Sequence, residues 1–86
     1  MLVTNIQISQ YAYDRLNAKH QANVKLTLPG KVVSLFCQLD MPLNENANNR
    51  TVAFVGDAIR QIKRMPEIRS GQQKLSFSDD LTYQVA

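Results

Sequence analysis

The stretch ANVKLTLPGKVVSLFCQLDM, residues 22–41, decides the fold of this chain. Apolar and polar residues alternate on both sides of Pro29-Gly30, and a period of two is typical of a β-strand with one buried face. The stretch therefore predicts a β-hairpin whose two strands present their apolar residues to the same side. The cross-strand pairs that we expect are Leu28 with Lys31, Leu26 with Val33, and Val24 with Leu35.

The Pro29-Gly30 dipeptide marks the turn of this hairpin. Two-residue hairpin loops prefer the primed turns, and these require a positive φ that an L-proline cannot adopt at the first central position. We therefore expect a longer loop or a β-bulge next to Gly30.

The segment from Thr51 to Met65 predicts the helix that covers the hairpin, and Pro66 ends it. The asparagine-rich residues 44–49 before it predict a polar loop. Gly56 lies in the middle of the helix, where glycine costs about 1 kcal/mol relative to alanine, so we expect a strand to cross closely there. The apolar residues expected to face the sheet are Val52, Val55, Ile59 and Ile62.

Alternation also predicts strands near both ends of the chain. Residues 2–9 form the first strand and residues 74–78 a later one, followed by a turn at Asp79-Asp80 and a further edge or frayed end at 81–85. The stretch from Ser9 to Gln21 suits two structures. Its helix-forming residues favour a short helix at about 10–20, but an extension of the first strand into a hairpin that turns near Asn17 also fits.

These elements predict an α+β fold. It is a mostly antiparallel sheet of about three to five strands, with a central hairpin at about 22–41 covered by one main helix at about 51–65. With the second helix at about 10–20 the order becomes βαββαβ, which is ferredoxin-like; without that helix the sheet is a meander.

Length and composition place the chain among small globular domains. Its 86 residues predict one domain, 1–86, and a hydrophobic fraction of 44% with 20% charged residues predicts a packed core. No apolar run reaches the roughly 20 residues that span a bilayer, and the first residues lack the pattern of a signal peptide. We therefore expect a cytoplasmic protein with no membrane partner.

Few residues of this chain are suited to catalysis. Cys37 and His20 are the best candidates for a nucleophile and its base, but the hairpin pattern points Cys37 into the core as a structural residue. Asp79-Asp80 alone is a poor metal site, and neither a glycine-rich phosphate loop nor a zinc motif occurs. We expect no enzyme activity, no catalytic residues, no cofactor or metal, and no small-molecule substrate.

Positive charge gathers in the second half of the chain. Residues 50–74 hold six basic residues against Asp57 and Glu67, a net charge of +4, whereas the whole chain has a formal net charge of +3. Such a group can contact phosphates, so one hypothesis is a small nucleic-acid-binding domain. The alternative is a solvated helix end, with Asp57 paired to Arg60 and Glu67 paired to Lys63. The candidate anion or nucleic-acid contacts are Arg60, Lys63, Arg64, Arg69 and Lys74.

The segment from Val32 to Cys37 is uncharged and strongly strand-forming, so we expect it to lie inside the sheet or to be paired. Val32 and Phe36 alternate with the inward residues and fall on the second face of the sheet, which one helical layer does not cover. These two residues are the candidate association surface. The leading hypothesis is a non-enzymatic protein-interaction or accessory module that acts as a homo-oligomer, simplest as a homodimer, or with a protein partner.

Overall fold

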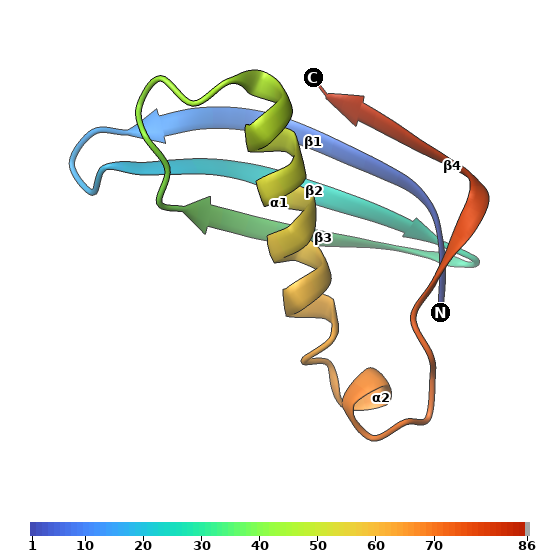
Figure 1. Ribbon diagram of the computed structural model, residues 1–86. Coiled ribbons are helices and arrows are strands. Elements are labelled where there is room, and N and C mark those ends of the chain that lie inside the picture. Colours follow the sequence, from blue (N-terminus) through green and yellow to red (C-terminus); the bar gives the residue numbers. More distant parts are fainter. Residues whose placement is uncertain (86) are drawn as a thin grey trace.

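The computed structural model describes residues 1–85, which form one four-stranded sheet with a helix across one face (Figure 1). The strand order is β3-β2-β1-β4; β2 is antiparallel to both neighbours, and β4 runs parallel to β1. The structure confirms an α+β fold in which one main helix covers the predicted hairpin. The elements are β1 (Leu2–Asp14), β2 (Lys19–Leu28), β3 (Lys31–Leu39), α1 (Ala47–Ile62), α2 (Pro66–Arg69) and β4 (Ser76–Val85).

The hairpin of β2 and β3 has the predicted register. Leu26 pairs with Val33 and Val24 with Leu35, so the apolar residues of both strands share a face. The expectation of a longer loop or a bulge is wrong, because Leu28 pairs directly with Lys31 across the two residues Pro29 and Gly30. Gly30 has a φ of +77°, and proline followed by a glycine with positive φ is the pattern of a type II turn.

The predicted helix at about 10–20 does not form, so the βαββαβ order does not arise. β1 continues to Asp14, and the chain turns at 15–18 into β2, as the alternative prediction had it. The meander expected in that case is wrong, because β4 crosses over to pair in parallel with β1. The alternation of apolar and polar residues along β1 is broken between Ser9 and Ala12, where the β1–β2 pairing is irregular and Gln10 has a φ of +56°. A bulge of this kind shifts the side-chain pattern by one residue. Pairing with β2 then outweighs the local helix propensity.

α1 begins earlier and ends earlier than the pattern of residues 51–65 predicts. Asn46 caps its first turn, and its side-chain oxygen accepts a hydrogen bond from the backbone N–H of Asn49 at 2.8 Å. Part of the predicted asparagine loop is therefore helical. After α1 ends at Ile62, Pro66 occupies the first position of α2. Within residues 1–85 no helix is long and apolar enough to cross a membrane.

The buried face of α1 is rotated relative to the predicted one. Its buried residues are Phe54, Val55, Ala58 and Ile62. Val52, which was predicted to face the sheet, is 73% exposed. The prediction that a strand crosses at Gly56 is also wrong, because this glycine is exposed and no heavy atom of another element lies within 4 Å of the position that a Cβ would take.

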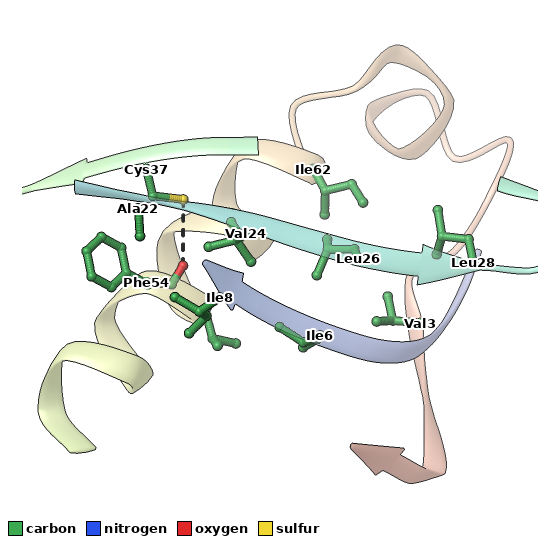
Figure 2. Close-up of a cluster of buried hydrophobic side chains, with 12 residues drawn as sticks. Val3, Ile6, Ile8, Ala22, Val24, Leu26, Leu28, Cys37, Phe54 and Ile62 are labelled. Carbon is green, nitrogen blue, oxygen red and sulfur yellow. Dashed lines mark hydrogen bonds between the residues drawn. The ribbon is translucent and has the colours of Figure 1, made fainter. Parts of the chain in front are cut away.

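The hydrophobic core lies between α1 and the face of the sheet that it covers (Figure 2). Every second residue of β2 from His20 to Leu28 is buried, as the alternating pattern requires. On the opposite face the same strand carries polar residues, and that face has no second layer in the described part of the chain. The fold is thus a two-layer structure with one open sheet face. The core residues drawn and labelled are Val3, Ile6, Ile8, Ala22, Val24, Leu26, Leu28, Cys37, Phe54 and Ile62.

Candidate association edge

β3 is an outer strand, and among residues 1–85 it pairs with β2 alone. The segment from Val32 to Cys37 is therefore paired on one side only, and the expectation that it avoids an open edge is wrong for residues 1–85. The Leu28–Lys31 pair closes a two-residue turn, which makes it a hydrogen-bonded pair, and such pairs recur at every second residue of an antiparallel ladder. It follows that residues 33, 35, 37 and 39 bond to β2. The backbone N–H and C=O groups of residues 32, 34, 36 and 38 point out of the sheet, and we call this row the β3 edge.

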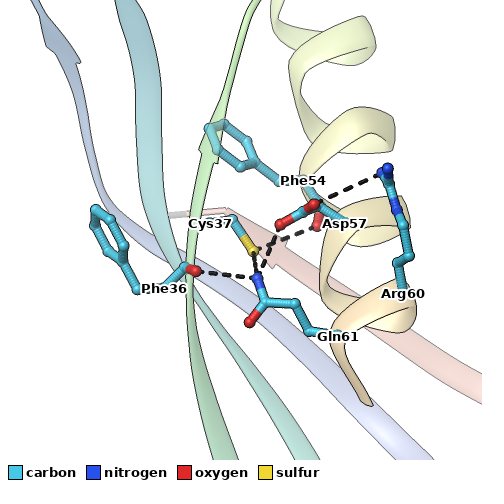
Figure 3. A network of polar contacts seen from close by, with 6 residues as sticks. All are labelled: Phe36, Cys37, Phe54, Asp57, Arg60 and Gln61. Carbon is cyan, nitrogen blue, oxygen red and sulfur yellow. Dashed lines mark hydrogen bonds and ion pairs between the residues drawn. The ribbon is translucent and has the colours of Figure 1, made fainter. Parts of the chain in front are cut away.

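The residues of the β3 edge also carry side chains on the open sheet face. Val32 is 54% exposed and Phe36 is 56% exposed, as the prediction of an uncovered second face requires. Figure 3 shows Phe36 pointing away from α1, whereas Cys37 points toward it. On β2 the residue opposite Phe36 is Asn23, and the next strand positions on this face are polar as well. The apolar surface on this side is therefore concentrated at the edge.

The side chain of Gln61 links α1 to the β3 edge (Figure 3). Its Nε2 donates to the backbone oxygen of Phe36 at 3.0 Å and to Oδ2 of Asp57 at 2.9 Å, and it lies 3.6 Å from Sγ of Cys37. Asp57 in turn lies 3.6 Å from the guanidinium of Arg60, as the sequence predicted. The oxygen of Phe36 is thus reached from outside the β2–β3 ladder, which agrees with its outward direction.

Cys37 lies in the core and not at the surface. Its side chain is fully buried, and the thiol approaches the backbone oxygen of Phe54 at 3.8 Å. Burial, followed by the nearby Asp57 carboxylate, raises the pKa of Cys37 to about 12. At neutral pH the sulfur therefore stays protonated, and a thiol is a poor nucleophile.

His20 is the one buried polar side chain in the described part of the chain, and both its ring nitrogens have partners. Nε2 lies 2.9 Å from the oxygen of Pro42, and Nδ1 lies 2.7 Å from the hydroxyl of Tyr11. Since a carbonyl oxygen only accepts, Nε2 carries the proton toward Pro42 and Nδ1 accepts from Tyr11. His20 forms no hydrogen bond with Cys37, so the two residues make no catalytic pair.

β4 forms the opposite edge of the sheet and is built differently. Its pairing with β1 is interrupted between Phe77 and Thr82, and Asp79-Asp80 lies in this irregular stretch, not in a turn between elements as predicted. After this irregular stretch, residues 81–85 form the predicted edge of the sheet. Thr82 donates to Oδ1 of Asn5 at 2.6 Å, which fixes β4 to the polar face of β1.

The five predicted anion contacts all lie on exposed positions from the last turn of α1 to the loop after α2. This part of the chain projects beyond the sheet (Figure 1). Arg60 pairs with Asp57, but the expected pair of Glu67 and Lys63 is not among the ion pairs of residues 1–85. Positive charge on this segment is thus only partly balanced by contacts. The five residues are Arg60, Lys63, Arg64, Arg69 and Lys74.

A shallow groove between α1 and β4 was not predicted from the sequence. It is lined by Thr51, Val52, Val55 and Tyr83, and Val52 and Tyr83 are both exposed. The helical periodicity placed Val52 in the core, and the position of β4 beside α1 could not be read from the pattern of either segment.

No group of histidine, cysteine, aspartate and glutamate side chains within residues 1–85 is arranged to hold a metal ion. Comparison of the chain with protein-family models, with curated proteins and with solved structures gives no match.

Proposed function

We propose that this chain is a non-enzymatic, cytoplasmic module that works by protein association through the β3 edge. The observation that carries the proposal is an uncharged, apolar strand left open at the side of a sheet. Natural sheets protect such edges with charges, prolines, bulges or covering segments, and β3 has none of these along Val32 to Cys37. Among the outward backbone groups of this segment, the oxygen of Phe36 accepts a hydrogen bond from the side chain of Gln61.

Strand addition is the mode of binding that suits this edge. The outward N–H and C=O groups of β3 supply main-chain hydrogen bonds to an extended segment, and alternate side chains supply selectivity. Val32 and Phe36 are the apolar contacts on the open face, where half of each side chain is accessible. His20 and Cys37 are engaged in the core, so neither is available for chemistry at this surface.

Sedimentation velocity over a wide range of protein concentration tests the proposal, because association through β3 makes the average mass rise with concentration. The chain offers a matched pair of variants: Phe36 on the β3 edge is 56% exposed, and Phe77 on β4 is 41% exposed. We expect Phe36→Ser to abolish association and Phe77→Ser to preserve it. A protein that stays monomeric at every concentration, or two variants that behave alike, would overturn the proposal.

A second candidate function is nucleic-acid binding by the exposed basic segment described above. The observation in its favour is that four of its residues, Lys63, Arg64, Arg69 and Lys74, form no ion pair within residues 1–85. Contacts of this kind give affinity that falls steeply with salt.

Fluorescence polarisation with single-stranded RNA and DNA at low salt tests this second candidate. Binding that weakens on Arg64→Ala together with Arg69→Ala, but not on Arg15→Ala in the exposed turn between β1 and β2, supports it. No binding, or equal loss in both variants, rules out this site.

A further inference from the structure

We propose that the partner of the β3 edge is the β3 edge of a second copy of this chain, paired antiparallel with Ser34 opposite Ser34 of that copy. This inference rests on the proposed function and names its partner. It would join the two sheets into one continuous sheet across a twofold axis through the Ser34 pair.

The residues of β3 on either side of Ser34 are apolar in the same order toward both ends of the strand. Val33 and Leu35 flank it on the side of α1, where both are partly buried, and Val32 and Phe36 flank it on the open face. Antiparallel pairing about Ser34 therefore places Val32 opposite Phe36 of the second copy, and Val33 opposite Leu35. Cross-strand pairs of an aromatic with a β-branched residue are among the stabilising ones in sheets.

The direction of the backbone N–H and C=O groups limits which other registers the two β3 strands could adopt. Only residues 32, 34, 36 and 38 have outward N–H and C=O groups, so the pairing can shift only in steps that keep these residues opposite one another. Pairing about Leu35 would place Val32 opposite Gln38, and pairing about Phe36 would place Val32 opposite Asp40. The register about Ser34 is the one that matches apolar residues with apolar residues on both faces.

The charged residues near the edge are compatible with this register. Lys31 falls opposite Cys37 of the second copy, so the two Lys31 side chains lie at opposite ends of the paired segment. Asp40 at the end of β3 is already paired with Lys19, at 2.6 Å. No like charges are therefore brought directly opposite each other, which would be destabilising.

The contact of Gln61 with Phe36 does not close the edge. A carbonyl oxygen has two lone pairs, so the oxygen of Phe36 can accept from Gln61 and from the N–H of Val32 in the second copy. A paired segment of this length buries less surface than the roughly 1,200 to 2,000 Å² of stable complexes, so we expect weak, concentration-dependent association.

Disulfide trapping tests the register directly. Residues in a hydrogen-bonded antiparallel pair have Cα atoms about 5.5 Å apart, within the range that a disulfide bridges. We expect Ser34→Cys to form a covalent dimer under mild oxidation. Gln38→Cys, on the same face of the same strand, is the matched control, because in this register its two copies lie about 26 Å apart. The unaltered chain is the blank, since its Cys37 is fully buried.

The expected result is at least about tenfold more trapped dimer for Ser34→Cys than for Gln38→Cys, lost when the protein is unfolded in urea before oxidation. Circular dichroism confirms that both variants are folded. Association in sedimentation without selective trapping at residue 34 would overturn the register and leave association through β3 standing. A protein that neither associates nor traps would overturn both.

Discussion

The two edges of the sheet differ in the features that prevent strands from associating. β4 interrupts its pairing with β1 between Phe77 and Thr82 and carries two adjacent aspartates in that stretch. β3 pairs with β2 without irregularity over its whole length and has no charge between Lys31 and Asp40. Bulges and charges are the usual protection of an edge against pairing with another chain.

This difference supports the proposed association through β3. An apolar strand left unprotected exposes a protein to aggregation, whereas the irregular pairing and the charges of β4 oppose pairing with another chain. The same contrast extends to the helix layer, because α1 contacts β3 through Phe54 and Gln61 and faces β4 across an open groove.

The largest effect is expected where α1 supports the sheet. Phe54 is 1% exposed and packs edge-on against Tyr11, with ring centroids 6.2 Å apart. Phe54→Ala should lower the free energy of unfolding by about 3–5 kcal/mol in urea titrations, because it leaves a cavity in the core. Phe77→Ala, on the exposed β4 edge, should cost less than about 1 kcal/mol. Similar losses would mean that β4 is as firmly packed as the core.

The thiol of Cys37 reports on the attachment of β3 to the core. Its pKa is raised from 9.0 to about 12, so the native state should hold roughly a thousandfold less thiolate than the unfolded chain and should react correspondingly slowly with a thiol reagent. The unfolded chain loses this proton first as pH rises. Stability should therefore be intact below pH 9.0 and decline as the pH rises toward about 12.

Thermal melts across this alkaline range check the effect. Cys37→Ala removes the titrating group and should flatten the part of the decline that Cys37 causes, while the lysines and tyrosines remain as a common background. Rapid labelling of the native protein would show instead that β3 opens readily from the core.

Replacing the two charged residues of β4 should make this edge more like the β3 edge. In a Phe36→Ser background, where association through β3 is lost, Asp79→Val with Asp80→Val should produce weak association through β4, limited by the irregular pairing that remains. Sedimentation velocity measures it. Asp79→Asn with Asp80→Asn removes the charges without adding apolar surface, and so separates the two causes. If neither pair of substitutions changes the average mass in sedimentation, the irregular pairing alone protects the β4 edge from association.

Removing the Gln61 contact should weaken the tie between α1 and β3. Gln61→Leu deletes its hydrogen bonds to Phe36 and Asp57, and we expect a loss of about 0.5–1.5 kcal/mol in the free energy of unfolding. Gln72→Leu, in the exposed loop after α2, is the control and should be neutral. Loss of association in Gln61→Leu, without loss of stability, would show that this side chain shapes the edge and not the fold.

The smallest effect is expected at the exposed helical glycine. Gly56→Ala should stabilise the protein by about 0.5–1 kcal/mol and leave association unchanged, because no heavy atom of another element lies within 4 Å of the added Cβ. Gly30→Ala in the β2–β3 turn should destabilise it, since Gly30 has a φ of +77°. A destabilised Gly56→Ala would indicate a contact at this position in an associated form.

Several errors of sequence interpretation share one cause. The bulge near Gln10 broke the alternation of β1, so a strand was mistaken for a short helix. The capping role of Asn46 was hidden in a run of asparagines that also suits a loop. Val52 fits the helical period but lies at the margin of the buried face, where the position of β4 decides its exposure. In each case a local pattern fitted two structures; a distant contact chose between them for residues 10–20 and for Val52, and the hydrogen bond from Asn49 to the side chain of Asn46 did so at the start of α1.

The candidate site was only half visible in the sequence. The exposure of Val32 and Phe36 followed from alternation and from having one helix to cover two sheet faces. The basic residues followed from counting charges. The position of β3 at the edge of the sheet did not follow.

By itself the sequence determined the hairpin register, the presence of one long covering helix and the burial of Val24, Leu26 and Leu28. These depend on the period of side chains along a strand or helix and on neighbours a few residues away. Only the tertiary structure decided that β4 crosses over to pair in parallel with β1 and that β3 is left at the edge. Strand order is set by contacts between residues far apart in the chain, and such contacts leave no period in the local sequence.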